Sequence, residues 1–383
     1  MGPLALEEEL YDVAITGGGL AGLALSIQLS QLGYKVVLLE KEQYPFHKVC
    51  GEYISMESWD FLQGLGLALE RMDISRIKRL QVSAINGKVL EHDLSPGGFG
   101  ISRYILDDSL CSIARSAGVR VEESTKVDDI VFTGNDFITR TAKKNYRSRV
   151  ACGSFGKRSN IDIKWKRSFV TIAKSRLNNY VGVKYHVKTS FPADMIALHN
   201  FSNGYCGISK IEEDKYCLCY LTKATNLLRA GESIPAMEQK VLGQNPHLKK
   251  LFSEMEIVYR APLTISRISF DKKKQVENNV LMVGDAAGMI TPLCGNGMSM
   301  ALHASKLAAK QIDLFLQQKI GREEMENLYS HEWRQQFAKR LQMGRGIQRL
   351  FGQSWLTNSF IQIAKSSPRL VNYLISQTHG SSF

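Results

Sequence analysis

The sequence predicts an α/β fold of two interleaved domains, one with a parallel sheet and one with an antiparallel sheet, followed by a helical C-terminus. Apolar strands flank an amphipathic helix near the start of the chain, which is typical of a parallel sheet. Alternating apolar and polar residues fill much of the middle, which favours antiparallel strands. With 383 residues and 44% hydrophobic content, the chain is long enough for two cores.

The first unit spans residues 11–41 and has the pattern of a dinucleotide-binding βαβ segment. Gly17, Gly19 and Gly22 have the GxGxxG spacing between an apolar strand and a helix of about four turns. The first glycine allows a tight turn, the second lets a pyrophosphate approach the backbone, and the third lets the helix pack on the strand. Glu40 ends the second strand, where a carboxylate takes a ribose 2′-hydroxyl.

Two later segments add to this pattern. Residues 280–300 read VLMVGDAAGMITPLCGNGMSM, and residues 103–121 follow the pattern RxxLDxxL and then AxxxGVxV. Together with the first unit, they resemble the family of FAD-dependent oxidoreductases that includes the geranylgeranyl reductases and the single-component aromatic hydroxylases, with the p-hydroxybenzoate hydroxylase-like fold. The resemblance covers residues 9–315. It implies a Rossmann-like FAD-binding domain interleaved with an antiparallel-sheet substrate domain.

The resemblance also suggests domain boundaries. It assigns residues 9–75, 100–160 and 275–320 to the FAD-binding domain, residues 76–99 and 161–274 to the substrate domain, and residues 321–383 to a helical C-terminal region. Within the substrate domain we expect a hairpin at Asn86-Gly87 and a loop over residues 95–100. Helices in the substrate domain are expected to break at Pro235 and Pro246.

Several residues would contact the cofactor if the resemblance holds. Cys50 and Gly51, in the segment KVCGE, match a segment of the geranylgeranyl reductases whose cysteine lies near the flavin ring. Arg103 would offset charge on the pyrophosphate or on the reduced flavin, and Asp285 would bond the ribityl chain. The predicted cofactor-binding residues are Gly17, Gly19, Gly22, Glu40, Cys50, Gly51, Arg103, Gly284, Asp285, Gly295 and Gly297.

The predicted catalytic residues are Cys50, Pro292 and Gly295. In the segment PLCGNG, backbone amides at a helix start would stabilise negative charge on the reduced flavin ring. The cysteine would tune the flavin, bond the substrate, or only fill space, and these alternatives remain open. Glu52 would bond the cofactor or fix its loop, and His47 is expected to be a partly exposed loop residue.

Three departures from the family pattern bear on the reaction. Phe155 replaces the aspartate of the GADGxxS motif. In the hydroxylases this motif is associated with both FAD and reduced pyridine nucleotide, so the use of NAD(P)H is left open. Gly288 stands where many hydroxylases carry histidine, which favours the reductases. Residues 204–207 lack the paired tryptophans of flavin halogenases and the aromatic-proline motif of the reductases.

Positive charge is concentrated in residues 140–188, which hold fourteen Lys or Arg and a single acid, Asp162, in a chain of net charge +12. This segment is either a solvated face or an attraction site for an anionic carrier or a membrane surface. No zinc-finger or RRM signature is present, and we expect no nucleic-acid partner. From residue 331 to 351, Trp333, Phe337, Leu341 and Phe351 are available for an apolar stripe among five Arg or Lys, which indicates either membrane docking or a helix that caps a domain.

The seven cysteines form no CxxC pattern, which indicates a reduced compartment and no metal site. The alternation around Cys217 and Cys219 predicts that both lie on one face of a strand, the core face. Acidic residues occupy positions 7–9, where a secretory signal needs basic charge, and no apolar run approaches the ~20 residues of a membrane span. We therefore expect a cytoplasmic protein, with peripheral membrane association still open.

These observations predict an FAD-dependent oxidoreductase that acts on a hydrophobic, isoprenoid or polyketide-like small molecule by hydride transfer through flavin N5. The CGE and GDAAG segments slightly favour reduction or dehydrogenation of a carbon–carbon bond. Two alternatives remain. One is a monooxygenase that uses NAD(P)H and O2, and the other is a flavin-binding fold that acts as a carrier without catalysis.

Overall fold

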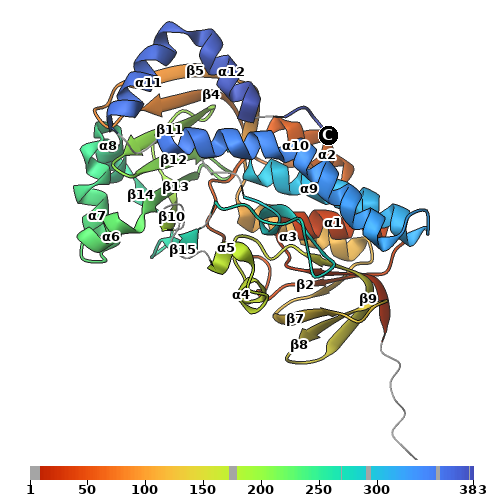
Figure 1. The fold of residues 1–383 in the computed structure, drawn as a ribbon. Coiled ribbons are helices and arrows are strands. Elements are labelled where there is room, and N and C mark those ends of the chain that lie inside the picture. Colours follow the sequence, from red (N-terminus) through yellow and green to blue (C-terminus); the bar gives the residue numbers. More distant parts are fainter. Residues whose placement is uncertain (1–8, 172–178, 269, 290–294, 351–353, 379) are drawn as a thin grey trace, which may run out of the picture.

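The computed structural model describes residues 9–171, 179–268, 270–289, 295–350, 354–378 and 380–383. Its elements form two sheets, with helices packed on both and a helical layer from the C-terminal part of the chain (Figure 1). This is the mixed α/β architecture that the sequence predicts.

The first sheet contains the dinucleotide-type unit. Its strands are β1 Leu10–Thr16, β2 Val36–Leu39, β6 Arg120–Glu122, β7 Val127–Phe132, β8 Phe137–Thr141, β9 Asn145–Gly153, β16 Val276–Glu277 and β17 Val280–Met282. The order is β16-β17-β9-β1-β2-β6, and β7 and β8 extend it from β9 as antiparallel strands. Within the run β17-β9-β1-β2-β6 each adjacent pair is parallel, as long connections require.

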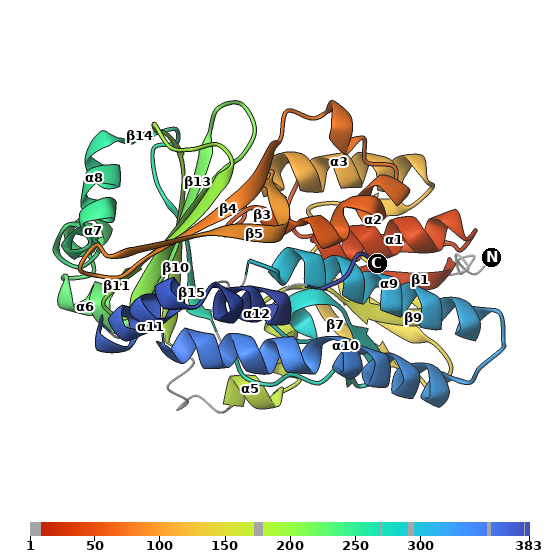
Figure 2. The same ribbon diagram turned by 90° about the horizontal axis from the view of Figure 1, so that it is seen from above.

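The helices on this sheet are α1 Leu20–Gln31, α2 Trp59–Gly64, α3 Arg103–Ser116 and α9 Gly297–Leu316. Helix α1 is buried on nearly all sides because α3 and α9 lie beside it on the sheet (Figure 2). Its leucines and alanines therefore belong to one large core that also includes the strands. Short 3-10 helices lie at Met56–Ser58, Leu69–Arg71, Leu242–Gln244 and Gly284–Ala286.

The second sheet is mostly antiparallel. Its strands are β3 Tyr53–Ser55, β4 Ser75–Ser83, β5 Val89–Gly100, β10 Tyr180–Lys188, β11 Met195–Phe201, β12 Gly204–Lys210, β13 Tyr216–Lys223, β14 Glu256–Ile257 and β15 Leu263–Ile268. The order is β14-β10-β13-β12-β11-β4-β5-β3, with β15 on β10. The β4–β11 pair is parallel, so the sheet is not wholly antiparallel.

The prediction of a loop at residues 95–100 was wrong, because β5 continues to Gly100. Its end pairs with both β3 and β4. A β-carbon on Gly98 would lie 2.4 Å from the Tyr53 ring. The strand can therefore pass beneath this ring only with glycine at residue 98. The glycines that signalled a loop are there for close packing.

Helices α4 Asn160–Lys164, α5 Ser168–Thr171, α6 Ala224–Arg229, α7 Ile234–Lys240 and α8 Pro246–Glu254 belong to the middle of the chain. Pro235 and Pro246 lie in the first turns of α7 and α8, so they begin helices and do not break them. A proline is well suited to this position because the first amides of a helix have no intrahelical acceptor. The hairpin at Asn86-Gly87 connects β4 to β5 as predicted.

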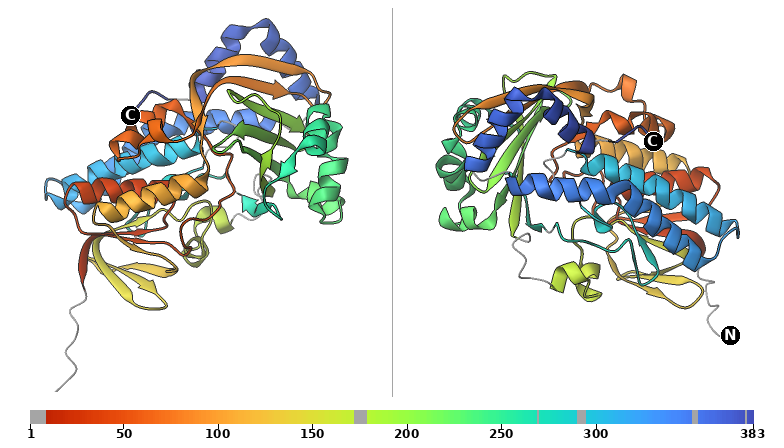
Figure 3. Two further views of the ribbon diagram at one scale, coloured as in Figure 1. Left: turned by 180° about the vertical axis from the view of Figure 1, so that it is seen from behind. Right: turned by 45° about the horizontal axis from the view of Figure 1, so that its top comes forward.

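The C-terminal helices are α10 Arg322–Leu350, α11 Ser354–Ser366 and α12 Pro368–Thr378. Helix α10 runs along α9, and α11 and α12 lie over β4 and β5 (Figure 3). Trp333, Phe337 and Leu341 are buried in the first core, so α10 is a capping helix and these three side chains are not available to a membrane. Phe351 lies outside the described residues.

Within the part of the chain that the structure describes, no helix is both long enough and apolar enough to cross a membrane. The basic segment 140–188 does not form one face. Arg167 and Lys184 are buried, and Arg147, Arg149 and Lys164 pair with acidic residues. The surface charge of the segment is therefore lower than its composition suggests.

Candidate functional site

The turn between β1 and α1 has the geometry that a bound pyrophosphate needs. Gly17 has a φ of 104°, and a β-carbon there would lie 2.6 Å from the carbonyl oxygen of Ser154. A β-carbon on Gly22 would lie 2.1 Å from the carbonyl oxygen of Gly17, so the helix can approach the strand only with glycine at this position. Gly19 is the N-cap of α1 and provides no side-chain cap, which leaves the first amides of the helix facing outward.

Two cations flank Gly19. A β-carbon on Gly19 would lie 3.7 Å from Nη2 of Arg103 and 3.8 Å from Nζ of Lys48. Arg103 donates two hydrogen bonds to Asp107, at 2.6 and 2.7 Å, and Lys48 donates one at 2.9 Å. Burial would raise the pKa of Asp107, but Arg103 and Lys48 hold it below its ordinary value. The three side chains together carry one net positive charge, which suits an anionic ligand.

Glu40 is buried at the end of β2. Its carboxylate accepts hydrogen bonds from the amide of Gly18 at 2.7 Å and from the amide of Glu42 at 3.1 Å. These bonds fix its orientation beside the glycine turn. A carboxylate has about four acceptor positions, so two amide bonds leave capacity for a ribose hydroxyl. The ribose role of Glu40 stays a prediction.

The loop of residues 48–52 is held by side chains from three other segments. The carbonyl of Lys48 accepts a hydrogen bond from Lys184 of β10 at 3.1 Å, and the carbonyl of Val49 accepts one from Lys157 at 3.2 Å. The Cys217 thiol of β13 donates to the carbonyl of Cys50 at 3.2 Å. Three successive carbonyls are therefore fixed, two of them by lysine ammonium groups.

Glu52 anchors the same loop to β10 and to the start of α3. Its fully buried carboxylate pairs with Lys184 and His186 of β10, and it accepts a hydrogen bond from the amide of Arg103 at 2.8 Å. Burial would raise the pKa of Glu52, but Lys184 and His186 outweigh it and lower this pKa. The pKa of Lys184 is raised by Glu52 despite burial. Both groups therefore stay charged near neutral pH, so Glu52 fixes its loop and does not act as a general base.

Cys217 lies on the face of β13 that points toward this loop, together with Cys219. The two cysteines share one face, as predicted, and on that face Cys217 is buried and Cys219 is partly buried. Tyr216, Leu218 and Tyr220 lie on the other face and belong to the second apolar cluster. Atoms of Glu52, His186 and Cys217 lie within 4.8 Å of one another, but Lys184 already pairs with the carboxylate and we assign no metal.

His47 is partly exposed, as predicted. Its ring stacks on Tyr104 at 4.5 Å and contacts the His186 ring edge-on at 5.3 Å. Desolvation, aided by Lys184 and His186, lowers the pKa of His47 to about 4. It is therefore neutral at pH 7.

The residues 153–159 form a turn that supports the glycine loop. The Ser154 hydroxyl donates hydrogen bonds to the carbonyls of Thr16 at 3.1 Å and Gly17 at 2.6 Å. The Phe155 ring lies over Gly153, where a β-carbon would approach it to 2.6 Å. The turn thus keeps its contact with the βαβ unit although the motif's carboxylate is absent.

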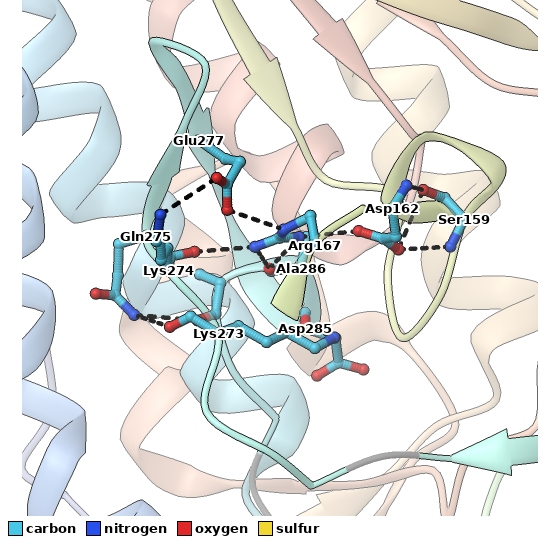
Figure 4. A network of polar contacts seen from close by, with 10 residues as sticks. Ser159, Asp162, Arg167, Lys273, Lys274, Gln275, Glu277, Asp285 and Ala286 are labelled. Carbon is cyan, nitrogen blue, oxygen red and sulfur yellow. Dashed lines mark hydrogen bonds and ion pairs between the residues drawn. The ribbon is translucent and has the colours of Figure 1, made fainter. Parts of the chain in front are cut away.

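The turn of residues 284–287 follows β17 and faces α1. Gly284 has a φ of 66°, and a β-carbon there would lie 2.9 Å from Cβ of Ala21. Figure 4 shows Arg167 beside Ala286 and Lys273 extended toward Asp285 of this turn. Arg167 donates twice to the carbonyl of Ala286, at 3.1 Å each, and Lys273 donates to the carbonyl of Asp285 at 2.8 Å.

The remaining predicted residues are Pro292, Gly295 and Gly297. Pro292 lies outside the described residues. Gly295 has a φ of 67°, and a β-carbon there would lie 3.0 Å from the Tyr53 ring of the second sheet. Gly297 begins α9. The predicted catalytic roles of Cys50, Pro292 and Gly295 stay predictions, and so does cofactor contact by Gly51.

Sequence reasoning missed four residues of this region: Arg167, Lys184, His186 and Lys273. All four are buried. Lys184 and His186 had a signal, because they interrupt the otherwise apolar strand of residues 181–187. Arg167 and Lys273 had none, since the turn carbonyls that they hold, those of Ala286 and Lys157, are far away in the sequence.

These observations fit FAD. The glycine turn admits a pyrophosphate where a side chain would block it, Arg103 and Lys48 supply positive charge beside it, and Glu40 is oriented toward the same turn. A model of the FAD binding domain family matches residues 10–147.

Two relatives of known name match most of the chain. The chain is 25% identical over 354 residues to digeranylgeranylglycerophospholipid reductase of Methanococcus vannielii, covering 87% of this chain and 84% of that protein. It is 26% identical over 374 residues to conditioned medium factor receptor 1 of Dictyostelium discoideum, covering 88% of this chain and 70% of that protein.

Solved structures share the fold. A geranylgeranyl bacteriochlorophyll reductase-like protein from Thermoplasma acidophilum matches with a TM-score of 0.79 and 16% identity, covering 97% of each chain. A probable FAD-dependent monooxygenase from Pseudomonas aeruginosa matches with a TM-score of 0.70 and 17% identity, covering 92% of this chain and 99% of that one.

Proposed function

Because the chain belongs to the superfamily of FAD-dependent oxidoreductases that includes the geranylgeranyl reductases and the single-component aromatic hydroxylases, we propose that it reduces or dehydrogenates a carbon–carbon bond. The proposed substrate is a hydrophobic small molecule of isoprenoid or polyketide type. FAD, when bound, supplies the group that accepts or donates a hydride. The chain's own residues bind this cofactor, hold the loops around it and orient the substrate.

The observation that supports the proposal best is the way in which the Cys50 loop is held between the two sheets. Lys184 and Cys217 reach this loop from the second sheet, and Lys157 reaches it from the turn after β9. A loop fixed at three successive carbonyls presents Cys50 and Gly51 in one conformation. A fixed backbone beside a cofactor is what preorganised catalysis needs.

The reductase direction is favoured over monooxygenation for two reasons. A sequence relative that matches most of the chain is named digeranylgeranylglycerophospholipid reductase. With Phe155, the turn of residues 153–159 also lacks the carboxylate of the hydroxylase motif that is associated with NAD(P)H. We therefore propose an electron donor other than NADPH.

Any anionic partner would meet only part of the basic segment. Arg140, Lys143 and Lys144 are exposed at the β8–β9 hairpin, whereas Arg167 and Lys184 are internal. We propose that an acidic carrier or a membrane surface bearing the lipid substrate is attracted to this exposed group. Replacing all three by glutamine should weaken binding to anionic lipid vesicles and leave FAD content unchanged.

The function is tested by anaerobic incubation of the dithionite-reduced protein with a geranylgeranyl lipid, followed by mass spectrometry. The expected result is a gain of two hydrogens for each double bond reduced, with simultaneous return of the yellow colour. Lipid of unchanged mass, together with an oxygenated product formed in air with NADPH and a phenol, would support the monooxygenase alternative instead.

A further inference from the structure

Lys273 is a buried cation without a carboxylate partner among the described residues. The residue is 7% exposed, and its Nζ donates hydrogen bonds to the carbonyls of Asp285 at 2.8 Å and Lys157 at 3.0 Å. These carbonyls belong to two turns of the candidate cofactor site. Figure 4 shows the Lys273 side chain extended toward Asp285.

The neighbouring cation Arg167 is arranged differently. It pairs with Asp162 at 2.9 Å and with Glu277 at 3.6 Å while it holds the carbonyl of Ala286. The positive charge of Arg167 is thus balanced by these carboxylates, and its role at the turn is structural. Lys273 brings positive charge to the same turn and has only neutral acceptors in hydrogen-bond contact.

The electrostatic surroundings of Lys273 are mixed. Burial lowers the pKa of this ammonium to about 8, Asp285 and Asp162 oppose the shift, and Arg167 and Lys157 add to it. Burying an ammonium that forms no direct ion pair costs free energy, so a negative charge that arrives nearby would stabilise it. A cofactor that becomes more negative when reduced provides such a charge.

We infer that Lys273 is a positioning residue that compensates the charge added when FAD is reduced, acting through the Asp285 turn. The inference rests on the proposed FAD-dependent function. An external two-electron donor adds two negative charges to the cofactor, and each proton that follows cancels one. If the cofactor takes up one proton, one negative charge is left, and the Lys273 ammonium balances it. By linkage, the ammonium stabilises reduced FAD and reduced FAD stabilises the ammonium equally.

The test is the two-electron midpoint potential of the FAD-containing protein, measured anaerobically by equilibration with an indicator dye. Lys273→Met should lower the ratio of reduced to oxidised cofactor at a fixed potential at least tenfold, which corresponds to a shift of about 30 mV to more negative potential. Lys273→Arg keeps the charge and should restore the potential. Lys274→Met is the matched control, because Lys274 is exposed and pairs with Glu277.

The pH dependence gives a second measurement on the unmodified protein. Above pH 8 the oxidised protein loses the Lys273 proton and reduction restores it, so each two-electron reduction should take up one additional proton. The midpoint potential should therefore fall by about 30 mV more per pH unit. Lys273→Met should not show this additional slope.

Each result decides the matter. A variant Lys273→Met that retains FAD and has an unchanged potential overturns the inference. If that variant does not retain FAD, a wild-type potential without the additional slope above pH 8 overturns it, and one with that slope supports it. Neither measurement uses the organic substrate, so a protein that binds no FAD contradicts the proposed function, and an FAD protein with unchanged potentials contradicts only the role of Lys273.

Discussion

The indole ring of Trp333 fills the space that a side chain at residue 288 would need. A β-carbon added to Gly288 would lie 2.5 Å from Cη2 and 2.9 Å from Cζ2 of Trp333. Trp333 belongs to α10, and Gly288 directly follows the Asp285 turn. The C-terminal helix therefore packs against the predicted cofactor turn, which explains why this chain has glycine where many hydroxylases carry histidine.

Replacing Gly288 by histidine should destabilise the protein. The new side chain would have to displace a buried indole ring, and overpacking of this kind costs about 1–3 kcal/mol. The measurement is urea unfolding followed by circular dichroism, together with FAD content. Gly321→His is the control, because nothing lies within 4 Å of a β-carbon there. Equal stability of the two variants would show that the Trp333 contact is not restrictive.

Gly19 and Gly22 should respond differently to substitution by valine. Gly19→Val has room in the protein itself, so the variant should fold, but it should not retain FAD because the side chain would occupy the pyrophosphate position. Gly22→Val should fail to fold, since its β-carbon would overlap the carbonyl of Gly17. Thermal unfolding and the flavin absorbance of the purified variants separate these effects. A Gly19→Val protein with stoichiometric FAD would contradict the assigned pyrophosphate position.

The Glu52 pair should make stability depend on acid pH. The pKa of Glu52 is lower in the folded protein than its ordinary value of 4.5, so the unfolded chain binds its proton first. Its contribution to stability is therefore complete above pH 4.5 and is lost as the pH falls through the folded-state pKa. Unfolding by urea between pH 6 and pH 3 measures this loss.

Glu52→Gln should remove that pH dependence and cost about 3–5 kcal/mol at neutral pH, because Lys184 would remain buried without its counter-charge. The double variant Glu52→Gln with Lys184→Met should recover part of this stability. Glu91→Gln, at an exposed position, is the control. If Glu52→Gln were as stable as the control, the ion pair would not anchor the Cys50 loop.

Phe155→Asp tests the role of the missing carboxylate. If its absence limits the use of pyridine nucleotide, the variant should be reduced by NADPH faster than the wild-type protein. Stopped-flow bleaching of the flavin under anaerobic conditions measures the rate. An unchanged rate would remove Phe155 as the reason for poor use of NADPH.

Much of the fold followed from sequence because its signals are local. The βαβ unit of Gly17, Gly19 and Gly22 has strand, turn and helix within one short segment, and the structure shows a steric role for Gly17 and for Gly22. The segment 95–100 was predicted wrongly because its glycines serve contacts that are distant in the sequence: Gly97 approaches Ile77, Gly98 approaches Tyr53 and Gly100 approaches Lys210.

The candidate site was less predictable from sequence because its supporting contacts are long-range. The pairing of Glu52 with Lys184 joins residues 132 positions apart, and Arg167 reaches the carbonyl of Ala286 across 119 positions. The role of each basic residue in segment 140–188 depended on such partners. Composition alone could not distinguish buried Lys184 from exposed Lys143.

The most direct test of the central claim is the visible absorption spectrum of the purified protein during anaerobic titration, first with NADPH and then with dithionite. We expect a yellow protein with stoichiometric FAD that NADPH bleaches slowly, that dithionite bleaches fully, and that regains its colour when an unsaturated isoprenoid lipid is added. A colourless protein that cannot be reconstituted with FAD would contradict the account.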